Sequence, residues 1–150
     1  MNKFMCRRYL LFCVSLFVNA LGIAFITKAA LGTSPITSVT YVLSMFTPFT
    51  IGQWTILLNL LFVILELFLM TREDLKSDLR MYLLQIPISF SFGMFIDLCM
   101  HYILFWLNPV EYVYMIVALL IGCVILAVGI ALEVKANAAM MAGEYFVKVI

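Results

Sequence analysis

Charged side chains are scarce in this chain of 150 residues, where Asp, Glu, Lys and Arg together make up 11%, against about 25% in ordinary soluble proteins. Apolar and aromatic residues account for 66%, and the mean hydropathy is +1.16. This composition excludes a soluble globular protein. The formal net charge is only +1, so the chain lacks the clustered basic surface that nucleic-acid binding requires, and we expect no nucleic-acid partner.

Residue types that carry catalysis and metal binding are equally rare. The chain has one histidine and four cysteines, and no two cysteines are spaced as CxxC. It contains no GxSxG, GxGxxG or phosphate-loop sequence. These patterns accompany nucleophilic catalysis, dinucleotide binding and phosphate binding. We therefore predict that the protein is not an enzyme and binds no cofactor or metal ion.

Four hydrophobic stretches are each long enough to cross a membrane as a helix, which takes about 20 residues. They cover about residues 9–27, 52–70, 81–107 and 112–134. We predict an all-α integral membrane protein, a polytopic helical bundle of about four transmembrane helices that forms a single membrane domain over residues 1–150. The lipid bilayer is its expected partner, and the sequence leaves a homo-oligomer open.

A further apolar segment is too short and too rich in hydroxyl residues to span a membrane. It follows Gly32 and begins with Thr33-Ser34-Pro35, where a hydroxyl can cap a helix and proline suits the first helical position. The segment ends before Pro48. We predict a re-entrant or half-depth helix, one of one or two such segments in the fold. Non-helical backbone at that depth must be buried in protein or line a wet cavity.

The basic residues near the span ends predict the orientation, because such residues favour the cytoplasmic side. Lys3, Arg7 and Arg8 place the N-terminus in the cytoplasm, and the polar run 72–80, a solvated loop or interfacial helix, carries three more basic residues. An even number of crossings must separate these two regions, which agrees with a short helix that does not span. We predict a multi-pass protein with a cytoplasmic N-terminus.

An internal repeat supports this organisation. Residues 20–29 align with residues 127–136 at an offset of 107, with six of ten positions identical, including a Lys-Ala pair at the end of each span. Three predicted crossings separate the copies, so they insert in opposite senses, as in the inverted repeats of many secondary transporters. The first repeat covers about residues 8–107. Residues from about 112 to 150 form only the start of the second repeat, so we expect the chain to be truncated at its C-terminus.

Ionisable side chains at membrane depth are costly and are therefore candidates for function. Lys28 and Lys135 occupy matching positions in the repeat, where adjacent helix N-termini would form positive pockets for an anionic group. Ser34 lies at the first of these helix starts. The alternative for each lysine is that it reaches the interface and keeps its charge in water. Glu66 is expected to reach the interface or to pair with Arg72.

Asp97 and His101 are four residues apart on the third predicted span, so they share one helix face. A carboxylate beside an imidazole could relay protons, because histidine titrates near physiological pH. The alternative is an ordinary hydrogen bond within the helix. Glu133 is a third candidate for coupling. The pairings that we predict across helices are Lys28 with Asp97, and Glu133 with Lys76 or Arg80.

Several of these segments carry a resemblance to a known family. The most specific is the Lys-Ala-x-Leu-Gly-Thr-Ser-Pro stretch at residues 28–35. The others cover residues 19–24, 85–90, 95–97 and 129–137. Together they resemble the bacterial YczE/YitT-type membrane proteins over nearly the whole chain. The resemblance implies a polytopic protein of the bacterial cytoplasmic membrane, described in some members as a permease or transporter. It implies no catalytic residues and a further Gly-rich hydrophobic region after residue 150.

These observations predict a secondary-transporter-like permease for a small solute that the sequence does not identify, an anion being one candidate. Lys28 and Lys135 would bind the anion or pair with carboxylates, and Asp97, His101 and Glu133 would couple an ion or proton. The alternative is a non-transporting regulatory or assembly protein in which the same groups only hold helices together. A wet, polar-lined cavity where the two Lys-Ala breaks meet would favour the transporter.

Overall fold

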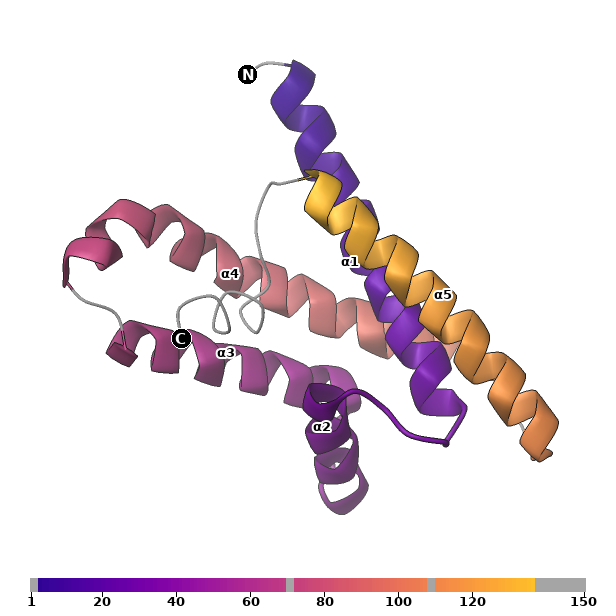
Figure 1. The fold of residues 1–150 in the computed structure, drawn as a ribbon. Coiled ribbons are helices and arrows are strands. Elements are labelled where there is room, and N and C mark those ends of the chain that lie inside the picture. The colour runs from indigo at the N-terminus through magenta and orange to yellow at the C-terminus, as the bar shows by residue number, and fades with distance from the viewer. Residues whose placement is uncertain (1–2, 70–71, 108–109, 137–150) are drawn as a thin grey trace.

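The computed structural model describes residues 3–69, 72–107 and 110–136, and every regular element in these ranges is a helix. The elements are α1 (Lys3–Lys28), α2 (Pro35–Phe46), α3 (Ile51–Leu69), α4 (Arg72–Leu98), the π-helix η1 (Cys99–Ile103) and α5 (Tyr112–Ala136). In Figure 1, α1 lies along α5, α3 lies along α4, and the short α2 lies at the start of α3. The all-helical prediction is confirmed for these residues. The further helical stretch expected after residue 136 lies outside them.

The helices α1 and α5 run antiparallel and pack closely because glycines lie at their crossing (Figure 1). A methyl group added at Gly22 would lie 2.8 Å from the backbone nitrogen of Leu126. One added at Gly129 would lie 3.0 Å from the backbone nitrogen of Asn19. Small residues let helix backbones approach in this way, which is how helices commonly associate in membranes.

The helices α3 and α4 also meet through glycines. A methyl group at Gly93 would lie 2.6 Å from the backbone oxygen of Gly52, and one at Gly52 would meet the backbone oxygen of Gly93. Neither position can carry a side chain without moving the helices apart. This contact fixes where α3 begins relative to α4.

The core lies where α1 crosses α4 and η1. Phe17 and Phe95 make an edge-to-face contact there, with ring centroids 5.6 Å apart. The buried apolar residues of this core are Phe12, Leu16, Ala20, Ala24, Phe92, Ile96, Cys99 and Leu104. Most large apolar side chains outside the core are exposed, as expected for a surface that faces lipid.

The break between α1 and α2 agrees with the prediction. Ala30 has a φ of 55° and Gly32 a φ of 141°, and these two residues turn the chain. Ser34 caps α2, accepting a 3.3 Å hydrogen bond from the Thr37 amide, and Pro35 occupies the first turn. With 12 residues, α2 is about 18 Å long at 1.5 Å per residue, too short for a hydrocarbon core of about 30 Å.

Among the described residues, three helices are long and apolar enough to cross a membrane. They are Tyr9–Lys28, Leu84–Ile103 and Tyr112–Lys135. The second predicted span is a shorter apolar helix by this measure, with its apolar part at Ile51–Glu66. The structure therefore supports three candidate spans where the sequence predicted four. The polar run 72–80 is helical and continues into α4, as the interfacial-helix alternative expected.

Candidate functional site

A cavity of about 510 Å³ lies where the α1–α2 break meets α3, α4 and α5. Ligand sites in proteins typically have volumes of about 300–1,000 Å³. The polar residues that line it are Asn19, Thr27, Thr33, Ser34, Thr37, Thr40, Thr55 and Asn59. The apolar residues are Ile23, Ile26, Ile36, Phe92, Ile96, Leu126 and Ile130. Within the described part of the chain, the lining has many hydroxyl and amide groups and no ionisable side chain.

Hydrogen bonds along the helices set how these hydroxyl groups face the cavity. Thr27 donates to the Ile23 carbonyl at 2.8 Å, and Thr55 donates to the Ile51 carbonyl at 2.8 Å. Thr40 donates in the same way to the carbonyl of Thr37 at 2.9 Å. Each hydroxyl hydrogen is therefore held by the helix that carries it, and the oxygen lone pairs remain.

A buried polar pair borders the cavity between α1 and α5. Asn19 Nδ2 donates a 2.7 Å hydrogen bond to Glu133 Oε2, and the two side chains are 3% and 4% exposed. Asn19 Oδ1 accepts no hydrogen bond from the residues that the structure describes. The side chain fits only because Gly129 has no Cβ, since a methyl group there would collide with Asn19 Oδ1. Glycine in α5 thus makes room for the amide in α1.

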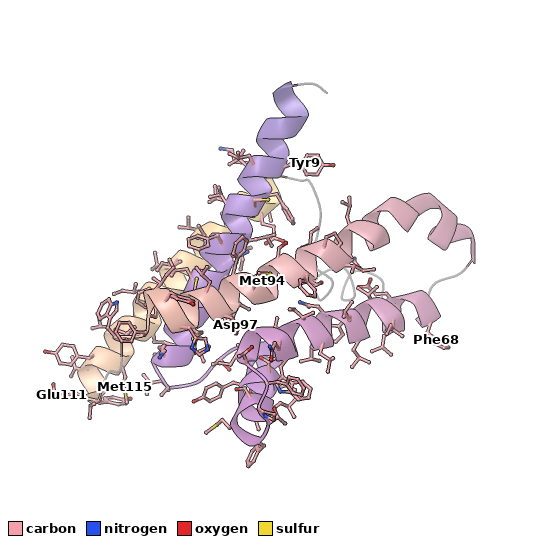
Figure 2. All side chains as sticks on the ribbon, turned by 180° about the vertical axis from the view of Figure 1, so that it is seen from behind. Tyr9, Phe68, Met94, Asp97, Glu111 and Met115 are labelled. Carbon is pink, nitrogen blue, oxygen red and sulfur yellow. The ribbon has the colours of Figure 1, made fainter. Side chains whose placement is uncertain are left out.

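A second polar cluster joins the start of α3 to α4. Asp97 Oδ1 accepts a 2.9 Å hydrogen bond from the Gly52 amide, and Oδ2 accepts a 2.6 Å bond from the Thr50 hydroxyl. Thr50 and Gln53 also bond each other reciprocally, at 3.1 and 3.2 Å, in a capping box. Figure 2 shows Asp97 on α4 near the start of α3. The carboxylate therefore anchors the helix start with charge-assisted bonds.

Comparison with known proteins identifies a family but no activity. Residues 6–150 match a family of unknown function, DUF6198. The chain belongs to this family. No curated protein and no solved structure matches it. The function of this DUF6198 protein must therefore be argued from its own residues, and the resemblance to YczE/YitT-type proteins stays a prediction.

The two predicted lysines do not meet in the structure of the DUF6198 chain. Lys28 is the last residue of α1 and is partly buried, and Lys135 is exposed near the end of α5. Because α1 and α5 are antiparallel, these ends lie at opposite ends of the pair (Figure 1). Neither lysine lines the cavity, whereas Ser34 does. The cavity expected between two Lys-Ala breaks therefore lies at the first break alone.

The predicted carboxylate pairings also differ from those observed. Asp97 takes its hydrogen bonds from α3, and no bond joins it to Lys28 or to His101 among the residues that the structure describes. His101 is exposed and lies in η1, whose wider turn shifts the register that α-helical spacing assumes. Glu133 pairs with Asn19. The predicted pairing of Glu133 with Lys76 or Arg80 concerns side chains outside the described part.

Glu66 does not reach the interface as expected. Its side chain is 0% exposed, and Gln85 of α4, 2% exposed, interacts with it. Among the side chains that the structure describes, none donates a hydrogen bond of good geometry to either Glu66 oxygen or to Gln85 Oε1. The predicted partner Arg72 has a side chain outside the described part. This carboxylate lies apart from the cavity, toward the other end of α3.

Sequence reasoning missed most of the cavity lining. The signal was present as polar residues spaced at helical intervals within apolar segments. In α2 these are Thr37 and Thr40, and in α3 they are Thr55 and Asn59. Residues three or four apart share one face of a helix, so each pair predicts a polar face. Which faces meet depends on the packing of helices, which the spacing does not reveal.

Proposed function

We propose that this protein is a permease-like membrane protein that binds a small polar solute in the cavity at the start of α2. The observation that carries the proposal is the lining itself, where eight hydroxyl and amide residues from α1, α2, α3 and the α1–α2 break face one cavity. Hydroxyl and amide groups at membrane depth are costly unless they serve packing or a solute. The proposal includes no chemical step.

The discontinuous path of α1 and α2 supports this proposal. Secondary transporters often form their solute sites from broken helices near the middle of the membrane. Here α1 ends at Lys28 and α2 begins at Pro35, and Thr33 and Ser34 of the intervening break line the cavity. A break that faces a cavity, here one lined in part by hydroxyl and amide groups, is an arrangement in which irregular backbone is tolerated within a membrane.

Reciprocal contacts between α1 and α5 support an inverted repeat as part of the proposal. Gly22 packs against Leu126. In the repeat, which has an offset of 107, Gly22 corresponds to Gly129 and Asn19 corresponds to Leu126. The contact of Gly129 with Asn19 is therefore the counterpart of the contact of Gly22 with Leu126, with the two helices exchanged, and both contacts are present. Such an exchange is expected when a pseudo-two-fold axis relates two antiparallel helices. A bacterial cytoplasmic membrane location and a cytoplasmic N-terminus belong to the same proposal.

Flux through reconstituted vesicles tests this function. Proteoliposomes would be mixed with small polyols, amino acids and carboxylates in turn, and swelling would be followed by light scattering. Thr40→Trp fills the cavity, whereas Val42→Trp places the same side chain on the exposed face of α2. We expect solute-dependent swelling that Thr40→Trp abolishes and Val42→Trp retains. Swelling equal to that of protein-free vesicles for every solute would refute transport.

A second candidate function is a non-transporting assembly or regulatory protein. The observation that favours it is that many polar groups already have partners, as Asp97 does at the start of α3 and Thr55 does within α3. In that case the polar groups only hold the helices together. Thr40→Trp would then change the stability of the protein, and neither the wild type nor the variant would give solute flux.

A further inference from the structure

We propose that the cavity selects an uncharged solute with an apolar body and a hydrogen-bond-donating head, such as a hydroxyl group. This inference rests on the proposed function, because it assigns the solute class of the same cavity. It replaces the anionic solute that the lysine positions predicted. The solute class follows from the hydroxyl and amide hydrogens of the lining that are not already donated within the protein.

Three of the four most deeply buried lining hydroxyl groups offer acceptors only, and the fourth, Thr37, shares its hydrogen bond with the Ser34 hydroxyl. Thr27, Thr40 and Thr55 are 4%, 0% and 8% exposed, and each donates its single hydroxyl hydrogen to a backbone carbonyl of its own helix. A hydroxyl that has donated still has lone pairs to accept with. A hydrogen-bond donor on the solute would therefore find an acceptor at these three hydroxyl groups, whereas an acceptor on the solute would find no free hydrogen there.

The amide of Asn19 offers the solute no donor, because Nδ2 donates to Glu133 and the side chain is only 3% exposed. Its Oδ1 accepts no hydrogen bond within the described part of the chain, but this oxygen is enclosed and lies against Gly129 of α5, where a methyl group would collide with it. The acceptors that a solute can meet are therefore those of the threonine hydroxyl groups. Asn59, the second amide of the lining, has no side-chain hydrogen bond among the described residues, so it can both donate and accept.

The start of α2 offers little to an anion. Pro35 has no amide hydrogen, the Thr37 amide donates to Ser34 Oγ, and the Ser38 amide donates to the Ser34 carbonyl at 2.8 Å. Only the Ile36 amide remains in this first turn. Ser34 and Thr37 share one 2.9 Å hydrogen bond between their hydroxyls. Anion sites at helix starts need several free amides, so this start is already closed by its own cap.

The remaining lining fits an apolar body. Seven aliphatic or aromatic residues face the cavity, among them Phe92 and Ile96 from α4 and Leu126 and Ile130 from α5. No charged side chain of residues 9–66, 84–107 and 110–135 lines the cavity, so a charged head would lose its hydration without an opposite charge from these residues in contact. An uncharged donor head on an apolar body satisfies both parts of the lining.

Three probes with one carbon skeleton test the head group. Cyclohexylmethanol, cyclohexanecarboxylate and cyclohexylmethylammonium would be titrated against the whole chain in lipid nanodiscs and followed by ligand-detected NMR. Thr40→Val and Thr55→Val keep the shape of the lining and remove one acceptor each. Thr40→Ser restores that acceptor. Ser44→Ala is the matched control, because Ser44 donates to the Tyr41 carbonyl in α2 but does not line the cavity.

The alcohol is expected to bind about tenfold more tightly than either charged probe, and each valine variant to weaken it about threefold to tenfold. Thr40→Ser should recover the affinity, and Ser44→Ala should leave it unchanged. Tightest binding of the carboxylate or of the ammonium overturns the head-group assignment and leaves the cavity as a binding site. Equal binding of the alcohol to the wild type and both valine variants overturns the assignment as well. The proposed function fails separately, if Thr40→Trp does not alter solute flux.

Discussion

Asn19 and Glu133 join α1 to α5 by a hydrogen bond of 2.7 Å between two side chains that are almost fully buried. The bond lies beside the cavity, so it couples helix packing to the position of one lining group. It also depends on Gly129, which leaves the space that the Asn19 amide occupies. Helix packing and cavity chemistry therefore share the same few residues.

Asn19→Leu should destabilise the protein by about 1–3 kcal/mol, because it removes a buried side-chain hydrogen bond and leaves Glu133 Oε2 without its Asn19 donor. Glu133→Gln should cost less, since the amide oxygen can still accept from Asn19 Nδ2. Unfolding in detergent, followed by circular dichroism, measures both changes. Equal stability of Asn19→Leu and the wild type would show that the bond contributes nothing.

Gly22→Val should destabilise the α1–α5 pair by about 2 kcal/mol or more, because the added atoms meet the backbone of Leu126, which cannot move independently. The matched control is Ala127→Val, which enlarges an exposed residue of α5. Thermal unfolding of both variants in the same detergent provides the comparison. Similar midpoints for the two variants would contradict the close approach of these helices.

Asp97→Ala should loosen the start of α3, because it removes the acceptor of both the Gly52 amide and the Thr50 hydroxyl. Hydrogen exchange at residues 50–56 should accelerate by about tenfold or more, as expected when about 1.5 kcal/mol or more of local stabilisation is lost. His101→Ala is the control, since His101 does not bond Asp97. An unchanged exchange rate in Asp97→Ala would refute this anchoring role.

The two turn residues of the α1–α2 break should respond in opposite directions. Gly32→Ala should destabilise by about 1 kcal/mol, because a φ of 141° is unfavourable for alanine although the space around it is open. Ala30→Gly should be neutral or stabilising by up to about 1 kcal/mol, because Ala30 already has a left-handed φ of 55°. The thermal unfolding midpoints of the two variants measure both changes in stability. A loss of stability in Ala30→Gly as large as that in Gly32→Ala would contradict this assignment.

Local features of the fold could be predicted from the sequence. The Ser34-Pro35 start and the Pro48 stop define α2, because capping and proline geometry act within a few residues. The apolar runs likewise predict α1, α4 and α5. The number of spans could not be predicted from length and composition alone, because the apolar part of α3 ends near Glu66 and falls short of a full span.

The candidate site could be predicted only in part. Ser34 was found because it caps a helix, but Asn19 and Thr40 depend on which helix faces pack together. The lysines were favoured by their repeat positions, yet antiparallel packing places Lys28 and Lys135 at opposite ends of one helix pair. Spacing and predicted orientation pair Asp97 with His101 or Lys28. In the structure the Gly52–Gly93 contact brings the start of α3 to Asp97 instead.

Cysteine accessibility tests the central claim, a wet cavity within the membrane domain, most directly. Thr37→Cys would line the cavity, and Val42→Cys would lie on the exposed face of α2, each in a variant that lacks the four native cysteines. Both would be treated in sealed vesicles with an uncharged, membrane-impermeant methanethiosulfonate reagent that carries a sugar group. We predict that Thr37→Cys reacts, that Val42→Cys does not, and that cyclohexylmethanol slows the reaction. An unreactive Thr37→Cys beside a reactive Val42→Cys would contradict the account.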